Sequence, residues 1–166
     1  MAFFHWISSI HRLDININLQ IMIIVDTKLE QRQKDNKPIR AGFVGAGMMS
    51  KAILNLIERN IPGMRVAAIS NRTIDKAKDI YEFSGVSDIK IVDSVKGLDN
   101  AVNSGKYAIT DDYSLLCESS SIDVVVDITG HVEFGVELLL TAFKHGKDIV
   151  TFNAEVDSTL GPILSV

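Results

Sequence analysis

The chain has 166 residues, of which 46% are hydrophobic and 23% are charged, and its formal net charge at pH 7 is −4. This balance is typical of a folded globular protein and excludes a disordered or fibrous chain, and the length suits one domain with a sizeable core. No run of Lys and Arg exceeds two residues, which argues against a nucleic-acid partner. The only cysteine, Cys117, excludes an internal disulfide and favours a cytoplasmic location.

Residues 1–21 differ from the rest of the chain. The first ten are largely apolar, and Arg12 and Asp14 then interrupt the run before aliphatic residues alternate with Asn and Gln. The apolar run is too short for a membrane span, which needs about 18 residues. Its cation also follows the apolar part, unlike that of a secretory signal. We interpret residues 1–21 as a loosely ordered extension, with an edge strand as the alternative and Met22 as an alternative start.

The first element expected after the extension is a polar helix, with Asp26 as its cap and Pro38 as its stop. The apolar run at 39–44 predicts a strand buried on both faces. After the glycines that follow, apolar residues recur at the spacing of one helix face over 49–57.

Further strands are expected at short apolar runs, at residues 65–70, 107–110, 123–128 and 148–152, with an ambiguous run at 89–92. Amphipathic segments predict helices between them, at 73–83, 95–103, 111–119 and 132–145, and a further helix is expected from Asp157.

Alternating strands and helices favour a Rossmann-type doubly wound α/β fold, with a parallel sheet and helices on both faces. For the five clear strands the predicted order is 3-2-1-4-5. No strand follows the last expected helix, so we expect one Rossmann domain over 22–166, truncated before its last strand. The sheet edge that this leaves open could pair with a second copy of the chain, so a homo-oligomer is a further expectation.

The sequence Gly45-Ala46-Gly47-Met48-Met49-Ser50 lies between the first strand and its helix. Gly45 allows a tight turn, and Gly47 lets the backbone approach a ligand without a Cβ. The helix that follows directs free N–H groups and its positive dipole end at an anion. The pattern is G-x-G-x-x-G with Ser50 in place of the third glycine, which predicts a dinucleotide site. The alternative is a tight turn that binds nothing.

The end of the second strand favours NADP over NAD. It reads Ser70-Asn71-Arg72-Thr73 and has no acid, whereas NAD sites usually place a carboxylate there for the ribose. Arg72 can pair with a 2′-phosphate bidentately, and Ser70 and Thr73 can donate from their hydroxyls. The alternative for Arg72 is a solvated surface arginine.

Two other strand ends face the same crevice. Gly130 follows the fourth strand and permits close approach to the cofactor. His131 could touch the nicotinamide ribose or a substrate, but such a histidine is more often only a polar residue at a helix start. Asn153 and Glu155 follow the fifth strand, where the amide would meet the nicotinamide and the carboxylate could orient a substrate. Both could equally be turn and cap residues. We find no metal-ligand cluster and no nucleophile motif, so no metal is expected.

The segments "IRAGFVGAGMMSKA", "VAAISNRT", "GKYAITDD", "IDVVVDITGHVEFG" and "DIVTFNAEVDSTLGPIL" together resemble the N-terminal domain of homoserine dehydrogenase-like oxidoreductases. The nearest subgroup carries a C-terminal SAF domain and includes deoxyxylulose phosphate reductoisomerase-like enzymes. This resemblance runs from about Ile23 to the end. It implies an NADP-binding domain and hydride transfer between the nicotinamide and a small hydroxy or carbonyl substrate.

By position, the resemblance implies three groups of contacts. Gly45, Gly47, Met48 and Met49 would line the pyrophosphate, Asn71 and Arg72 would meet the adenosine ribose phosphate, and Thr129, Gly130, Asn153 and Glu155 would flank the nicotinamide. The family continues into a last Rossmann strand, a substrate domain and the SAF domain. Its catalytic residues are expected there, so we identify no catalytic residue here. A non-catalytic dinucleotide-binding or redox-sensing module and an inactive fragment are the alternatives.

Overall fold

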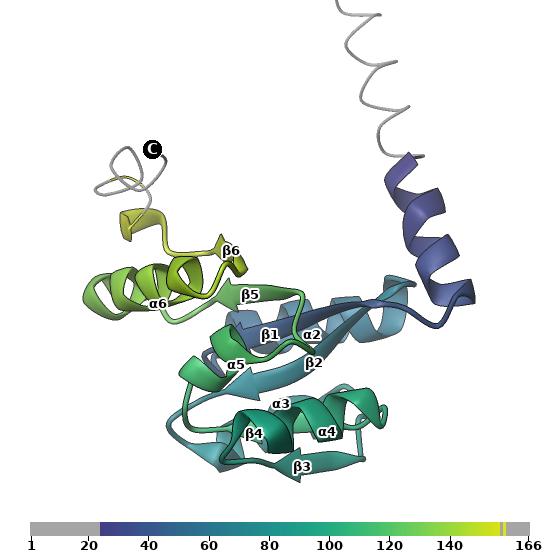
Figure 1. Cartoon of the computed structure of the whole chain (residues 1–166), viewed down its shortest axis with the longest axis horizontal. Coiled ribbons are helices and arrows are strands. Elements are labelled where there is room, and N and C mark those ends of the chain that lie inside the picture. The colour runs from purple at the N-terminus through teal and green to yellow at the C-terminus, as the bar shows by residue number, and fades with distance from the viewer. Residues whose placement is uncertain (1–23, 157, 159–166) are drawn as a thin grey trace, which may run out of the picture.

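The computed structural model describes residues 24–156 and 158. Its centre is a sheet of six parallel strands in the order β3-β4-β2-β1-β5-β6 (Figure 1). The strands are β1 (Ile39–Val44), β2 (Met64–Ser70), β3 (Ile89–Ile91), β4 (Tyr107–Thr110), β5 (Val124–Asp127) and β6 (Asp148–Thr151).

The Rossmann-type doubly wound fold expected from the sequence is therefore confirmed, and the five clear strands follow the order 3-2-1-4-5. The order differs from the expectation at one edge, where the ambiguous run forms β3 and pairs with β4. Lys90 and Ile91 are exposed in this edge strand. An edge strand has few buried positions, so its apolar pattern is weak, which is why the sequence left it undecided.

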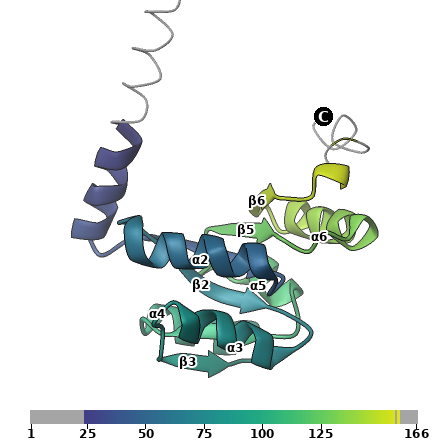
Figure 2. The same cartoon turned by 180° about the vertical axis from the view of Figure 1, so that it is seen from behind.

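Helices cover both faces of the sheet (Figures 1 and 2). They are α2 (Met48–Asn60), α3 (Ile74–Phe83), α4 (Val95–Asn103), α5 (Ser114–Glu118) and α6 (Val132–Lys144). Leu54 and Tyr81 bring α2 and α3 into a buried cluster on one face. Leu98, Cys117 and Leu138 bring α4, α5 and α6 into a second cluster on the other face, so Cys117 is a core residue.

A helix also precedes β1 and covers residues 24–34. The prediction that Asp26 caps this helix is wrong, because residues 24 and 25 are already helical. The predictions for residues 1–21 and for Met22 fall outside the described residues.

The N-terminal helix packs against the turn between α2 and β2. Gly63 has φ +72° there, and a Cβ on it would overlap the carbonyl oxygen of Leu29. The amide of Gly63 donates to Gln33 Oε1 at 2.9 Å, and its carbonyl accepts from the amide of Ile39 at 2.8 Å. Only glycine fits this approach, so the helix is fixed at the amino ends of the strands, away from their carboxyl ends.

Strand β2 contains a bulge, because its register against β1 shifts between Ala41 and Gly42. The amide of Val66, next to the shift, donates to Glu58 Oε1 at 2.7 Å. The hydroxyl of Tyr107 donates to Glu58 Oε2, also at 2.7 Å. Glu58 thus satisfies a strand amide that the bulge displaces from the ladder, and it joins α2 to β2 and β4.

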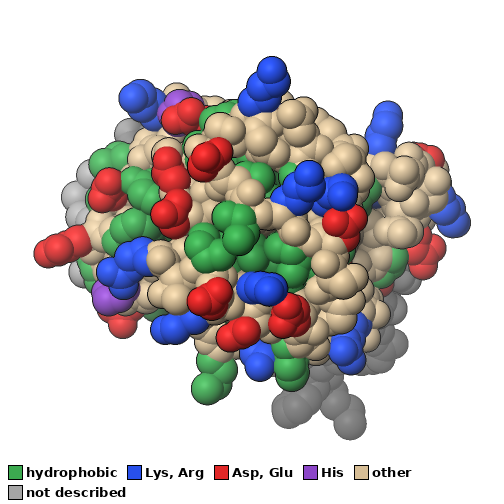
Figure 3. Space-filling model, turned by 90° about the horizontal axis from the view of Figure 1, so that it is seen from below, with side chains coloured by type: hydrophobic (Ala, Val, Ile, Leu, Met, Phe, Trp, Pro, Cys, Tyr) green, Lys and Arg blue, Asp and Glu red, His purple; other side chains and the backbone are tan. Residues whose placement is uncertain are grey.

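The surface mixes charges of both signs. On the face shown in Figure 3, acidic and basic side chains are interspersed and no patch of one sign stands out. Within residues 24–156 and 158, none of the helices has the length and apolar content that a membrane crossing needs.

Candidate functional site

A cleft of about 690 Å³ opens at the carboxyl ends of the strands, where the turns after β1, β2, β4 and β5 meet. Several predicted site residues line it, namely Gly45, Gly47, Ser70, Asn71, Arg72, Thr73 and Thr129. The other predicted residues do not, namely Met48, Met49, Gly130, Asn153 and Glu155.

A second hollow of about 470 Å³ lies at the opposite end of the sheet. Among its lining residues, the Arg65 guanidinium lies 4.2 Å from the centre of the Tyr107 ring, and Tyr107 is bonded to Glu58. Arg65 also donates to the carbonyls of Gly105 and Lys106 at 3.1 and 3.0 Å. Most of these groups are bonded within the chain, although Arg65 Nε has no acceptor among the described residues. The glycine turn and most of the predicted site residues line the other cleft, so we place the functional site there.

The two glycines of the turn after β1 are required for different reasons. Gly45 has φ +107°, and a Cβ on it would lie 3.0 Å from the carbonyl oxygen of Ile128. The fold itself therefore requires glycine at this position. Gly47 has φ −97°, and a Cβ on it would have no atom within 4 Å. Nothing in the described part of the chain requires glycine there, and the space in front of it is open.

The amides of the turn are already partly engaged. The amide of Ala46 donates to Asn71 Oδ1 at 3.1 Å, and that of Gly47 points at Ser50 Oγ at 3.4 Å. In contrast, the amides of Met48 and Met49 have no acceptor within the described residues. These amides begin α2, and such a helix end is a ready anion site. The free donors therefore lie in the first turn of the helix and not in the glycine turn.

Asn71 holds the turn in place. Its Oδ1 accepts from the Ala46 amide, and its Nδ2 donates to the carbonyl of Thr73 at 2.8 Å. Both ends of the side chain are thus used within the chain. Ser70 is buried and its carbonyl accepts from the amide of Gly45 at 2.9 Å. Thr73 begins α3 without a side-chain cap bond, so its hydroxyl is available at the cleft.

Two cations line the cleft beside β2. Arg72 and Lys76 are exposed, and neither belongs to an ion pair with another described residue. Arg72 precedes Thr73, the residue before α3, and Lys76 lies in the first turn of α3, so both border the same part of the cleft. Lys76 was missed from the sequence, although its place in the first turn of the helix that follows the second strand was a signal that could have found it. Asp111 contributes an acidic group to the same cleft from the end of β4.

At the other side of the cleft, a buried carboxylate connects the ends of β5 and β6. Asp127 is fully buried, and its Oδ1 accepts from the amide and the hydroxyl of Thr129 at 3.0 and 2.7 Å. Its Oδ2 accepts from the hydroxyl of Thr151 at 3.2 Å. In α6, a Cβ on Gly135 would lie 3.0 Å from Asp127 Oδ2, so glycine lets the helix approach this group. In the sequence, Asp127 falls within the predicted strand at 123–128, and no local pattern indicates this role.

Asn153 and Glu155 stand outside the cleft lining. Asn153 is buried, and its Oδ1 accepts from the amide of Val156 at 3.3 Å, which makes it a helix cap. Its Nδ2 has no acceptor among the described residues. The helix after β6 is thus formed by 154–156 and 158, before the predicted start at Asp157, which lies outside the described residues. Glu155 is exposed.

The start of α6 completes the wall. His131 lines the cleft as the residue before α6, and its side chain makes no cap bond. Gly130 before it is exposed and has φ +68°. Tyr113 and Phe134, which the sequence analysis did not select, line the cleft as an edge-to-face pair 5.0 Å apart. The Tyr113 hydroxyl donates to Glu137 Oε1 at 2.8 Å.

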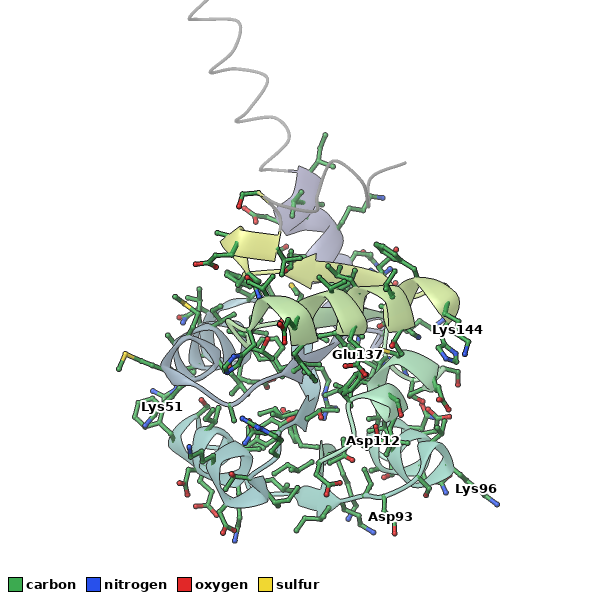
Figure 4. The ribbon with its side chains drawn as sticks, turned by 90° about the vertical axis from the view of Figure 1, so that its left-hand side faces the viewer. Lys51, Asp93, Lys96, Asp112, Glu137 and Lys144 are labelled. Carbon is green, nitrogen blue, oxygen red and sulfur yellow. The ribbon has the colours of Figure 1, made fainter. Side chains whose placement is uncertain are left out.

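The charged residues labelled in Figure 4 differ in their surroundings. Glu137 projects from α6 toward the α5 side, whereas Lys51, Lys96 and Lys144 extend outward at the periphery (Figure 4). Lys51 lies over the ring of Phe83, 3.8 Å from its centre.

Across the described residues, no group of three His, Cys, Asp or Glu side chains could hold a metal ion.

The profile of one protein family matches residues 45–161, from the glycine turn onward, and it is described as the NAD-binding domain of homoserine dehydrogenase. The chain belongs to this family. A homoserine dehydrogenase of Methylobacillus glycogenes is 28% identical over 117 residues, which cover 70% of this chain and 25% of that protein. A homoserine dehydrogenase of Pseudomonas aeruginosa is 27% identical over 117 residues, covering 70% of this chain and 23% of its own length. The chain thus spans about a quarter of the length of these relatives.

Solved structures share the fold. A homoserine dehydrogenase from Thiobacillus denitrificans has a TM-score of 0.57 and 24% identity, with 78% of this chain and 26% of that chain covered. A scyllo-inositol dehydrogenase from Lactobacillus casei with bound NAD(H) has a TM-score of 0.50 and 18% identity, with 69% and 28% covered. A 3-ketoreductase from Actinomadura kijaniata with NADP has a TM-score of 0.50 and 23% identity, with 69% and 29% covered.

The family is that of the dinucleotide-binding domain of homoserine dehydrogenase-like oxidoreductases. Its structural neighbours include one with NAD(H) and one with NADP, so the likeness alone leaves the form of the cofactor undecided. Membership of the subgroup with a SAF domain stays a prediction.

Proposed function

We propose that this chain is the NADP-binding part of an oxidoreductase that moves hydride between a nicotinamide cofactor and a small hydroxy or carbonyl substrate, as in homoserine dehydrogenase. The observation that carries the choice of NADP is the pair Arg72 and Lys76, which line the cleft without an ion pair within the described residues. Segment 70–74 at the end of β2 contains no carboxylate, where an NAD site usually has one.

The fit to a dinucleotide rests on the first turn of α2. Met48 and Met49 lie outside the cleft lining, but their free amides directly follow Gly47, which lines it. With the positive end of the helix dipole, these amides would hold the pyrophosphate. The open space in front of Gly47 leaves room for that group to approach the backbone. Asn71 supports this arrangement indirectly, because it bonds the amide of Ala46 and so fixes the turn.

The remaining contacts follow from the two sides of the cleft. Arg72 and Lys76 would pair with the 2′-phosphate of the adenosine half, with the Thr73 hydroxyl as a further donor. The nicotinamide half would then lie toward Thr129 and Gly130, at the end of β5. Bound NADP supplies the hydride acceptor or donor. We assign the substrate contacts and the acid–base groups to polypeptide beyond the quarter of the relatives' length that this chain spans.

The test is a calorimetric titration of the full chain with NADPH and with NADH. Arg72→Ala and Lys76→Ala should each weaken NADPH about tenfold, because each removes a charge-assisted bond of about 1.4 kcal/mol, and should change NADH less than about twofold. Lys78→Ala is the matched control, since Lys78 is exposed on the same helix, outside the cleft, and pairs with Glu82 at 3.7 Å. Equal losses for both cofactors, or an effect of Lys78→Ala as large as the others, would reject the NADP assignment.

A further inference from the structure

The hydrogen bonds around Asp127 determine where the hydroxyl proton of Thr129 points. Thr129 Oγ1 donates to Asp127 Oδ1 at 2.7 Å, and the backbone amide of Thr129 donates to the same oxygen at 3.0 Å. The other carboxylate oxygen accepts from Thr151, the residue opposite Asp127 in the β5–β6 register. The carboxylate is fully buried and so has no solvent alternative to these three donors.

A threonine hydroxyl has one proton and two lone pairs. Because Asp127 takes the proton of Thr129, only the acceptor capacity of that hydroxyl remains. Thr129 is half-buried and lines the cleft, whereas Thr151 lies outside the cleft lining. At this end of the cleft, the Thr129 hydroxyl can therefore accept a further hydrogen bond and cannot donate one.

We propose that Asp127 sets the hydrogen-bonding polarity of Thr129, so that the cleft accepts a hydrogen bond from the carboxamide NH₂ of the nicotinamide. The inference rests on the proposed function, which puts the adenosine half beside Arg72 and the nicotinamide half beside β5. Asp127 is a positioning residue, and Thr129 is the residue that touches the cofactor. The nicotinamide half of the cofactor has two kinds of hydrogen-bond donor, the carboxamide NH₂ and the ribose hydroxyls.

Nicotinic acid adenine dinucleotide phosphate separates these donors, because it keeps the ribose and replaces the carboxamide by a carboxylate. Calorimetry on the full chain should show NADP⁺ binding about tenfold more tightly than this analogue, since the analogue loses one bond and places an acceptor against an acceptor. Thr129→Val removes the hydroxyl at nearly constant shape and should bring the two affinities within about twofold of each other. Equal affinities in the unaltered chain, or an undiminished preference in Thr129→Val, would overturn the inference.

Variants of the carboxylate test the positioning role. Asp127→Ala frees the hydroxyl proton of Thr129 and should also remove the preference, whereas Asp127→Asn keeps an oxygen acceptor and should restore it. Thr151→Val removes the other bond to the carboxylate and should leave the preference unchanged. If Asp127 only joined β5 to β6, Thr129→Val and Thr151→Val would have the same effect on the preference. That result would contradict the proposal.

Adenosine 2′,5′-bisphosphate, which lacks the nicotinamide half, distinguishes this inference from the proposed function. Its affinity should stay within about twofold in Thr129→Val and in the Asp127 variants, because its contacts lie at the other side of the cleft. A parallel loss of bisphosphate affinity would show general damage and reject the specific role of Thr129. If the unaltered chain bound neither the bisphosphate nor NADP⁺, the proposed function would fail as well.

Discussion

Alanine at Gly45 and at Gly47 should separate what the fold requires from what a ligand requires. At Gly45, φ +107° lies outside the ordinary range of L-residues, which costs about 1–3 kcal/mol. The new Cβ would also lie 3.0 Å from the backbone oxygen of Ile128, which cannot rotate away as a side chain could. Together these terms amount to about 3 kcal/mol, a large part of the roughly 5–15 kcal/mol that keeps a domain folded.

At Gly47 the same methyl group meets nothing within 4 Å, and φ −97° is open to any residue. Alanine is a poorer helix cap than glycine, but it also restricts the unfolded chain, and these effects of about 0.5–1 kcal/mol nearly cancel. The free energy of unfolding should therefore change by less than about 0.5 kcal/mol. NADPH affinity should fall at least about tenfold, because the methyl group occupies the approach to the free amides of α2.

Urea unfolding followed by circular dichroism gives the stabilities, and calorimetric titration of the full chain gives the affinities. Gly45→Ala serves as the destabilised reference. Gly47→Ala should have nearly the same free energy of unfolding in urea as the unaltered protein. Unchanged NADPH binding in Gly47→Ala would mean that no ligand approaches this backbone. A loss of stability at Gly47 as large as at Gly45 would refute the division between the two glycines.

Three further outcomes follow from buried groups. Gly135→Ala should lower the unfolding midpoint in urea, because its Cβ would lie 3.0 Å from Asp127 Oδ2. The Asp127 carboxylate cannot easily move away, since three hydrogen bonds hold it. A higher midpoint would show that the helix propensity of alanine dominates. Burial, and next the hydrogen bond to Glu58, raise the pKa of Tyr107 to about 12, above its unfolded value near 10. The contribution of Tyr107 to stability is therefore complete below about pH 10 and is lost as the pH rises toward 12. A smaller loss of stability over that range in Tyr107→Phe than in the unaltered chain, measured by urea unfolding, would confirm this, and an equal loss would contradict it. Burial also raises the pKa of the Cys117 thiol to about 11. A thiol reagent at neutral pH should therefore react with Cys117 only as fast as the chain unfolds locally. Reaction at the rate of a free thiol would contradict the burial of Cys117.

Local patterns were enough to predict the fold. Each buried strand is a short apolar run and each helix has one apolar face, so the alternation of strands and helices could be identified without tertiary information. The edge strand β3 was left undecided because two of its three residues are exposed. The predicted cap at Asp26 was wrong, because residues 24 and 25 are already helical.

The candidate site was predictable only where a motif is continuous in the sequence. The turn at Gly45 and the segment around Arg72 line the cleft, and their roles toward a ligand stay predictions. The clamp between Asn71 and the amide of Ala46 joins residues 25 positions apart, and no local pattern announces such a bond. The contact between Asp127 and Thr151 spans 24 positions and depends on the pairing of β5 with β6 in the same way.

Glu58 is bonded to Val66 and Tyr107 at the amino ends of the strands, opposite the cleft. A single carboxylate therefore fastens three elements at a place that no ligand in the cleft could reach. Substitutions around Arg72, where we propose that the 2′-phosphate binds, should leave these bonds of Glu58 unchanged. The lining of the cleft and the stability of the opposite end of the sheet thus depend on different side chains, so the first can change without weakening the second.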